Sequence, residues 1–241
     1  MALMRTSNPA LKEGVFDSRA RTGDGAMTIH GTVNRTAFLL LLVVLAASWT
    51  WSGASGPWIL VGCLGGLVLG LVTCFQKAWS PVTAPLYALC EGLALGGISA
   101  HYAARFPGIV VPAVGLTFGV LAALLAAYAS RLIQPSENFK LGVVAATGGI
   151  ALFYLLMFVM GLFGVHPAFF HGSSPLAIGI SAAVAVIAAL NLVLDFDFIE
   201  QGAQSGAPKH MEWYGAFGLL VTLVWLYLEI LRLLSKLRSR D

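Results

Sequence analysis

The chain has 241 residues, of which 58% are hydrophobic and only 10% charged, and its formal net charge is +3. Soluble domains average roughly 45–50% apolar and about 25% charged residues. A soluble domain, a disordered chain, a nucleic-acid-binding arm and a secreted disulfide scaffold are therefore excluded, and we expect no nucleic-acid partner. Because the apolar residues form long unbroken runs rather than alternating, the sequence predicts an all-α integral membrane protein and not a β-barrel.

Seven stretches have the length of about 20 apolar residues that a helix needs to cross a bilayer, and Pro and Gly residues separate most of them. The polar segment 1–34 lacks the apolar core of a signal peptide, so we expect a soluble tail there. A seven-helix domain should cover residues 35–235, followed by a short basic tail at 236–241. The predicted spans are 35–53, 57–75, 80–103, 108–128, 141–164, 175–199 and 211–234.

The placement of Lys and Arg predicts the orientation in the membrane, since cytoplasmic segments carry an excess of these residues. With seven crossings, nine basic residues fall on the side of the N-terminus and five on the opposite side. This distribution favours a cytoplasmic N-terminus. The basic residues near the C-terminus then lie on the far side, unless one of the spans is re-entrant.

Small residues mark the faces at which membrane helices approach closely. The second span carries a doubled G-x-x-x-G motif, and the third carries one such spacing; the residues are Gly62, Gly66 and Gly70, and Gly92 and Gly96. Tight packing within one bundle is the simpler interpretation, and a homodimer face is the alternative.

Glu91 lies near the middle of the third span and has no basic residue within one helical turn. A charged group at this depth costs roughly 2.5–3.5 kcal/mol on insertion scales, so it requires a role. One interpretation is a carboxyl that binds a proton or a cation on a pathway. The other is a protonated Glu that forms a hydrogen bond with a neighbouring helix.

The end of the sixth span is acidic, with Asp195, Asp197 and Glu200 following Asn191. Asn191 and Asp195 are four residues apart and should share a helix face, whereas Asp197 points about 200° away from Asp195. Carboxylates with an Asn are ligands suited to a hard cation such as Ca²⁺, so Asp195 and Asp197 are candidate metal ligands. A solvated acidic helix end is the alternative.

Glu229 and Arg232 in the seventh span are three residues apart and are expected to form an ion pair on one helix face. Enzyme motifs are weak. Gly97-Ile98-Ser99-Ala100 lacks the second Gly of the G-x-S-G motif of intramembrane serine proteases, and His101 lies on the wrong face to act as a base. We therefore expect no enzymatic activity and no cofactor.

Four segments together resemble the transmembrane Bax inhibitor family, in its bacterial branch. They are Met4-Arg5-Thr6-Ser7-Asn8-Pro9-Ala10, the third-span segment from Ala88 to Ser99, the sixth-span segment from Ala189 to Glu200, and Leu228-Glu229-Ile230-Leu231-Arg232. The resemblance covers about residues 34–235. It implies a seven-helix bundle with a central last helix, located in the bacterial inner membrane.

The resemblance also implies a pH-sensitive calcium leak, in which an Asp in the sixth helix and an Asp in the seventh share a proton. Asp195 matches the first of these through its spacing to Ile199. Counting back from Arg232 places Thr222 at the second position, whereas matching the motif Leu226-Tyr227-Leu228-Glu229 makes Glu229 the counterpart. If Thr222 is correct, the acids left to partner Asp195 are Asp197, Glu200 and Glu212.

Two hypotheses of different classes follow. The first is a cation leak with Glu91 and Asp195 on the path and Ca²⁺ as the transported ion. The second is a non-conducting regulator that binds other membrane proteins, such as a membrane protease, through its tail and the face of Gly62, Gly66 and Gly70.

Overall fold

The computed structural model describes residues 25–52, 55–164 and 174–240, and seven of its helices are long and apolar enough to cross a membrane. They are α1 (Ile29–Trp51), α2 (Ser55–Phe75), α3 (Ser80–Arg105), α4 (Val110–Ala129), α5 (Glu137–Leu162), α7 (Pro175–Gln204) and α8 (Met211–Arg238), and the short 3₁₀ helix η2 (Lys77–Trp79) precedes α3. The protein is thus an all-α, multipass membrane bundle, as the sequence predicts.

Local sequence signals set several helix boundaries. The side chains of Thr28, Ser136 and Ser174 accept hydrogen bonds from backbone N–H groups in the first turns of α1, α5 and α7, which satisfies donors that have no partner within the helix. Proline lies in the first turn of α3 and of α7. Gly206, with a φ of 67°, forms the turn between α7 and α8, a conformation that glycine adopts without steric cost.

Two of the expected boundaries differ from the structure. The segment predicted as a tail up to residue 34 already contains the first turns of α1, because Thr28 caps a helix that begins at Ile29. At the other end, α8 continues to Arg238, and Lys236 is buried rather than part of a free tail. Polar residues at both ends are helical because they form contacts with neighbouring helices. The expected tail at residues 1–24 lies outside the described part of the chain.

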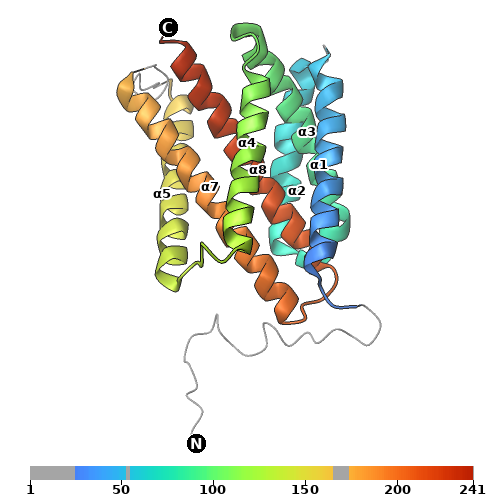
Figure 1. Ribbon diagram of the computed structural model, residues 1–241. Coiled ribbons are helices and arrows are strands. Elements are labelled where there is room, and N and C mark those ends of the chain that lie inside the picture. The colour runs from blue at the N-terminus through green and yellow to red at the C-terminus, as the bar shows by residue number, and fades with distance from the viewer. Residues whose placement is uncertain (1–24, 53–54, 165–173, 241) are drawn as a thin grey trace, which may run out of the picture.

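The last helix occupies the middle of the bundle (Figure 1). It packs against α1, α3, α4 and α7, whereas α5 lies at the periphery and packs against α7. Many of the fully buried large side chains belong to α8, among them Leu220, Leu226 and Leu231. The central position of α8 places its polar side chains against several other helices at once.

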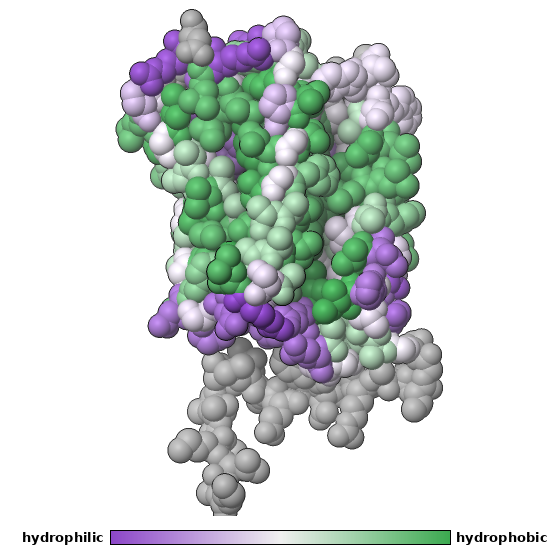
Figure 2. All heavy atoms as spheres, viewed as in Figure 1, coloured by the Kyte–Doolittle hydropathy of each residue, from purple (hydrophilic) through white to green (hydrophobic). Residues whose placement is uncertain are grey.

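On the face shown in Figure 2, an apolar band covers the bundle between two polar ends. The start of α1 and the end of α8 lie at opposite ends of the bundle (Figure 1), as an odd number of crossings requires. Exposed Leu, Val, Phe and Trp side chains dominate the helix surfaces in this band. This surface is suited to lipid, in which apolar side chains do not need to be hidden from water.

Candidate functional site: a carboxylate cavity inside the bundle

A cavity of about 780 Å³ lies among α2, α3, α7 and α8, and it extends along α8 from Tyr214 to Leu228. Two acidic side chains line it: Glu91 from α3 and Asp195 from α7. Their neighbours include Tyr87, Thr222 and two cysteines, Cys63 and Cys74. The structure thus brings together two carboxylates that are 104 positions apart in the sequence.

Asp195 has an unsatisfied oxygen. Its Oδ2 atom is buried and has no hydrogen-bond partner among the described residues. Thr222 on α8 lies opposite the carboxyl group, and its hydroxyl donates a 3.3 Å hydrogen bond to the carbonyl of Gly218. A Cβ atom added at Gly218 would lie 3.8 Å from Asp195 Oδ1. Position 222 therefore faces Asp195, and it carries a hydroxyl where the family resemblance implies an acid.

Glu91 has no cationic partner among the ion pairs of the described chain. Its carboxyl group lies beside the Tyr87 side chain, one turn earlier on α3. On the other side is Gly66 of α2, where an added Cβ would come within 2.9 Å of Glu91 Oε1. Tyr87 is an additional residue of this site, and its i−4 spacing from Glu91, which places both side chains on one helix face, is the sequence signal for it.

Asp197 does not join Asp195. Its carboxylate accepts hydrogen bonds from Lys140 Nζ of α5 at 2.8 Å and from Gln201 Nε2 at 2.5 Å. The candidate metal site at Asp195 and Asp197 is therefore not formed, because two residues that are two positions apart point to different sides of α7. Among the described residues, no group of three or more His, Cys, Asp or Glu side chains is arranged to hold a metal ion.

Asn191 also faces away from the cavity, although it is four residues from Asp195. Its amide donates 2.8 Å hydrogen bonds to Thr147 Oγ1 on α5 and to the Ile187 carbonyl. The Asn191 amide and the Asp195 carboxyl group therefore do not line the same cavity. A neighbouring helix, α5, provides Asn191 with a hydrogen-bonding partner outside the cavity.

The two other candidate partners of Asp195 are engaged elsewhere. Glu200 accepts hydrogen bonds from Tyr128 at 2.5 Å and from Arg131 at 2.7 Å, and it therefore fastens the end of α4 to α7. Glu212 does not line the cavity either. The acids at this end of the bundle thus do not supply the second carboxylate beside Asp195, and Glu91 is the acid that shares its cavity.

Glu212 is completely buried at the start of α8 and joins three segments. It accepts hydrogen bonds from the backbone N–H and the hydroxyl of Thr28 at 2.8 and 2.9 Å. It also pairs with Lys209 at 2.8 Å and with Arg35 of α1. These contacts fix the residues that precede α1 to the α7–α8 turn, where Met27 N–H donates to the Ala207 carbonyl at 2.7 Å.

The predicted ion pair between Glu229 and Arg232 is confirmed, with 3.0 Å between the Arg232 guanidinium and Glu229 Oε1. A third residue joins it from α5: the Tyr154 hydroxyl donates to Glu229 Oε1 at 2.7 Å and accepts from Arg232 at 2.7 Å. Glu229 lies seven positions beyond Thr222 on α8 and does not face Asp195. Its role in this structure is to connect α5 and α8.

The glycines of α2 and α3 are packing positions inside the bundle. A Cβ added at Gly62 would come within 2.6 Å of the α3 backbone, and one at Gly92 within 2.5 Å of the Val43 carbonyl of α1. Gly66 and Gly70 face Glu91 and Tyr87, and Gly96 faces α1. The simpler interpretation is confirmed. The same face of α2 is consequently occupied by α3 and is not available to another membrane protein.

A sequence model of the Bax inhibitor 1 like family matches residues 8–239, nearly the whole chain. The chain belongs to this family. The comparison with curated proteins gave no match. Ser99, the candidate nucleophile of the weak protease motif, shares a 2.6 Å hydrogen bond with the Tyr227 hydroxyl.

Proposed function

We propose that this Bax inhibitor 1 like protein is a cation leak pathway of the bacterial inner membrane and that Ca²⁺ is among the ions it passes. The observation that carries this proposal is Asp195 Oδ2, a buried carboxylate oxygen without a partner that borders a cavity inside a membrane bundle. Intramembrane acids of this kind mark ion pathways by default, and carboxylate oxygens are preferred ligands of Ca²⁺.

The extent of the cavity supports this assignment. Along α8 it is lined from Tyr214 to Leu228, a distance of about 21 Å at 1.5 Å per residue. The hydrocarbon core of a bilayer is about 30 Å thick. The cavity thus covers roughly two-thirds of the membrane, and the remainder is packed around the Glu229–Arg232–Tyr154 cluster. We assign the structure to a closed state in which the open part faces the cytoplasm, on the side of the N-terminus.

Calcium efflux from vesicles tests the proposal. Purified protein is reconstituted into calcium-loaded vesicles, and flux is recorded across about pH 5–8. We expect Asp195→Asn to lose most of the flux and Glu91→Gln to reduce it or to shift its pH dependence. Asp197→Asn is the matched control, since it makes the same change on the same helix but faces α5. Equal effects at positions 195 and 197 would contradict the assignment of Asp195.

Thr222→Asp is a gain-of-charge test of the same site. The new carboxylate would lie opposite Asp195, and two adjacent like charges retain a shared proton to higher pH. We expect protonation of Asp195 to close the path, so the pH at which the path closes should rise relative to the wild type. An unchanged midpoint would show that Asp195 does not control closure. Folded wild-type protein without any cation flux would instead favour the non-conducting regulator.

A further inference from the structure

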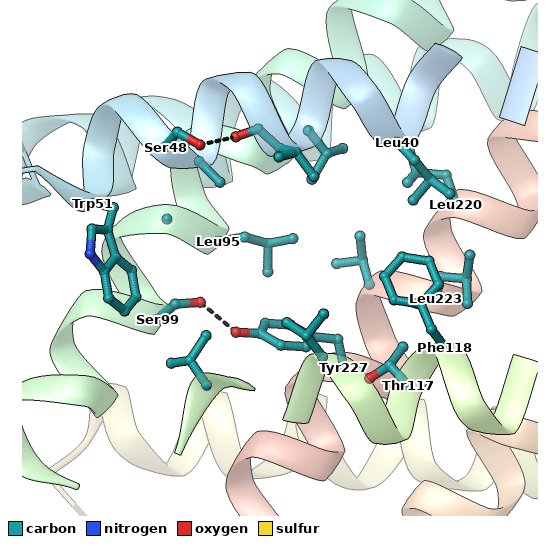
Figure 3. Close-up of a pocket in the computed structure, with 17 residues that line it drawn as sticks. Leu40, Ser48, Trp51, Leu95, Ser99, Thr117, Phe118, Leu220, Leu223 and Tyr227 are labelled. Carbon is teal, nitrogen blue, oxygen red and sulfur yellow. Dashed lines mark hydrogen bonds between the residues drawn. The ribbon is translucent and has the colours of Figure 1, made fainter. Parts of the chain in front are cut away.

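A second cavity, of about 260 Å³, lies on the other side of α8 from the carboxylate cavity, between α1, α3, α4 and α8 (Figure 3). Its lining is almost entirely apolar. α1 and α4 form its two rims without packing closely against each other. The residues from these two helices are Leu40, Val43, Val44, Ala47, Ser48, Trp51, Val110, Val114, Thr117 and Phe118. We call this cavity the α1–α4 groove.

The α1–α4 groove is more polar at one end than at the other. Trp51, Ser48 and Ser99 lie at one end, and Leu40, Leu220 and Phe118 lie at the other (Figure 3). The hydroxyls are already satisfied: Ser48 donates to the Val44 carbonyl at 2.7 Å, and Ser99 bonds to Tyr227 at 2.6 Å. An apolar cavity whose polar groups are satisfied does not retain water, so its occupant must be apolar.

The length of the groove matches one leaflet of a bilayer. Trp51 is the last residue of α1, and Trp side chains are enriched at the membrane–water interface. Leu40 lies eleven positions earlier, which corresponds to about 16 Å along the helix. Half of the hydrocarbon core is about 15 Å. The groove therefore extends from the membrane boundary to the midplane, in the leaflet on the side where α8 ends.

The mouth of the groove opens onto the lipid-facing surface. Val44, Trp51, Val114 and Phe118 line the groove and are also 39–56% exposed. Their exposed side chains belong to the apolar outer surface of α1 and α4. A membrane helix, about 10 Å across with its side chains, is too large for this volume, whereas one hydrocarbon chain is narrow enough to enter between α1 and α4.

We propose that the α1–α4 groove is a binding site for one acyl chain of a bilayer phospholipid, whose head group lies at the level of Trp51. The chain would fill the gap that α1 and α4 leave between them and would support α8 from the side opposite Asp195. Leu95 borders both cavities, so the bound chain would contact the wall of the carboxylate cavity. The binding itself does not depend on whether the protein conducts ions.

Photolabelling locates the chain. The full-length protein in detergent micelles receives an equimolar amount of phosphatidylglycerol with a diazirine in one acyl chain, and the labelled peptides are identified by mass spectrometry after irradiation. We expect the label to concentrate on α1 and α4. In Val114→Trp, which fills the groove, labelling should fall several-fold. The matched control is Val111→Trp, because Val111 is 78% exposed on the same helix and lies outside the groove.

Two results would overturn the proposal. One is label spread evenly over all lipid-facing helices, including the peripheral α5. The other is unchanged labelling in a folded groove-filling variant. If Val114→Trp does not fold, Val44→Phe fills the same groove from α1, and Leu45→Phe is its control because Leu45 is equally exposed but does not line the groove.

Discussion

The two buried carboxylates of α8, Glu212 and Glu229, differ in their partners from the two carboxylates that line the cavity. Glu212 and Glu229 are 0% and 2% exposed, and each has a cationic partner. Asp195 and Glu91 are half-buried, and neither takes part in an ion pair among the described residues. The paired acids join helices to one another. The unpaired acids face a cavity, where an ion can reach them.

This comparison predicts that stability and flux depend on different acids. Removing one member of a buried ion pair leaves the other charge uncompensated, which is strongly destabilising. Removing an acid that has no cationic partner breaks no ion pair. Four substitutions test this, ordered by the loss of unfolding free energy that we expect.

Glu212→Ala should have the largest effect, a loss of about 3–5 kcal/mol. The substitution removes the acceptor for Thr28, Lys209 and Arg35 together. The measurement is unfolding in mixed micelles with increasing SDS, followed by circular dichroism. Glu137→Ala is the control, because its carboxylate is 89% exposed and pairs only with Lys140; it should cost about 1 kcal/mol or less. Similar losses in both variants would contradict a special role for Glu212.

Glu229→Gln should cost about 2 kcal/mol, the range for a hydrogen bond to a charged group. Arg232 loses its counter-charge, while the Tyr154 hydroxyl retains an acceptor at position 229. The double variant Glu229→Gln/Arg232→Gln should recover part of the loss, since no uncompensated charge is left. The same unfolding titration measures both proteins. If the double variant loses more unfolding free energy than the two single variants lose together, the result would argue against the pair.

Asp197→Asn should cost about 1 kcal/mol or less, because the pair with Lys140 is partly exposed and such pairs contribute little. Its calcium flux should equal that of the wild type. Unfolding and efflux are measured on the same preparation. A large loss of flux at unchanged stability would place Asp197, rather than its neighbour, on the ion path.

Asp195→Asn should have the smallest effect on stability, with no loss or a small gain, because no ion pair is broken and a buried charge is removed. Flux should nevertheless fall the most among the four variants. The decisive measurement compares the loss of calcium flux with the change in unfolding free energy in one preparation. A loss of unfolding free energy well above the roughly 1 kcal/mol of an average substitution would show that Asp195 is a structural residue.

The sequence by itself determined the number and type of the elements. Runs of apolar residues with Pro and Gly between them predict seven membrane helices, and Ser or Thr before several of these runs caps the helices that the structure contains. The ion pair of Glu229 and Arg232 was also predictable, because residues three apart are neighbours on any α-helix. The i+4 spacing of small residues likewise indicated where α2, α3 and α1 approach closely.

Only the tertiary structure decided which acid receives a cation and which remains unpaired. Asp197 meets Lys140 of α5, and Glu212 meets Arg35 of α1, partners that are distant in the sequence. Asn191 bonds to Thr147 instead of joining Asp195. Helical periodicity fixes which residues share a face, but the packing and rotation of each helix against its neighbours determine what that face meets. For this reason the cavity shared by Glu91 and Asp195 is visible in the fold and not in the sequence of either helix.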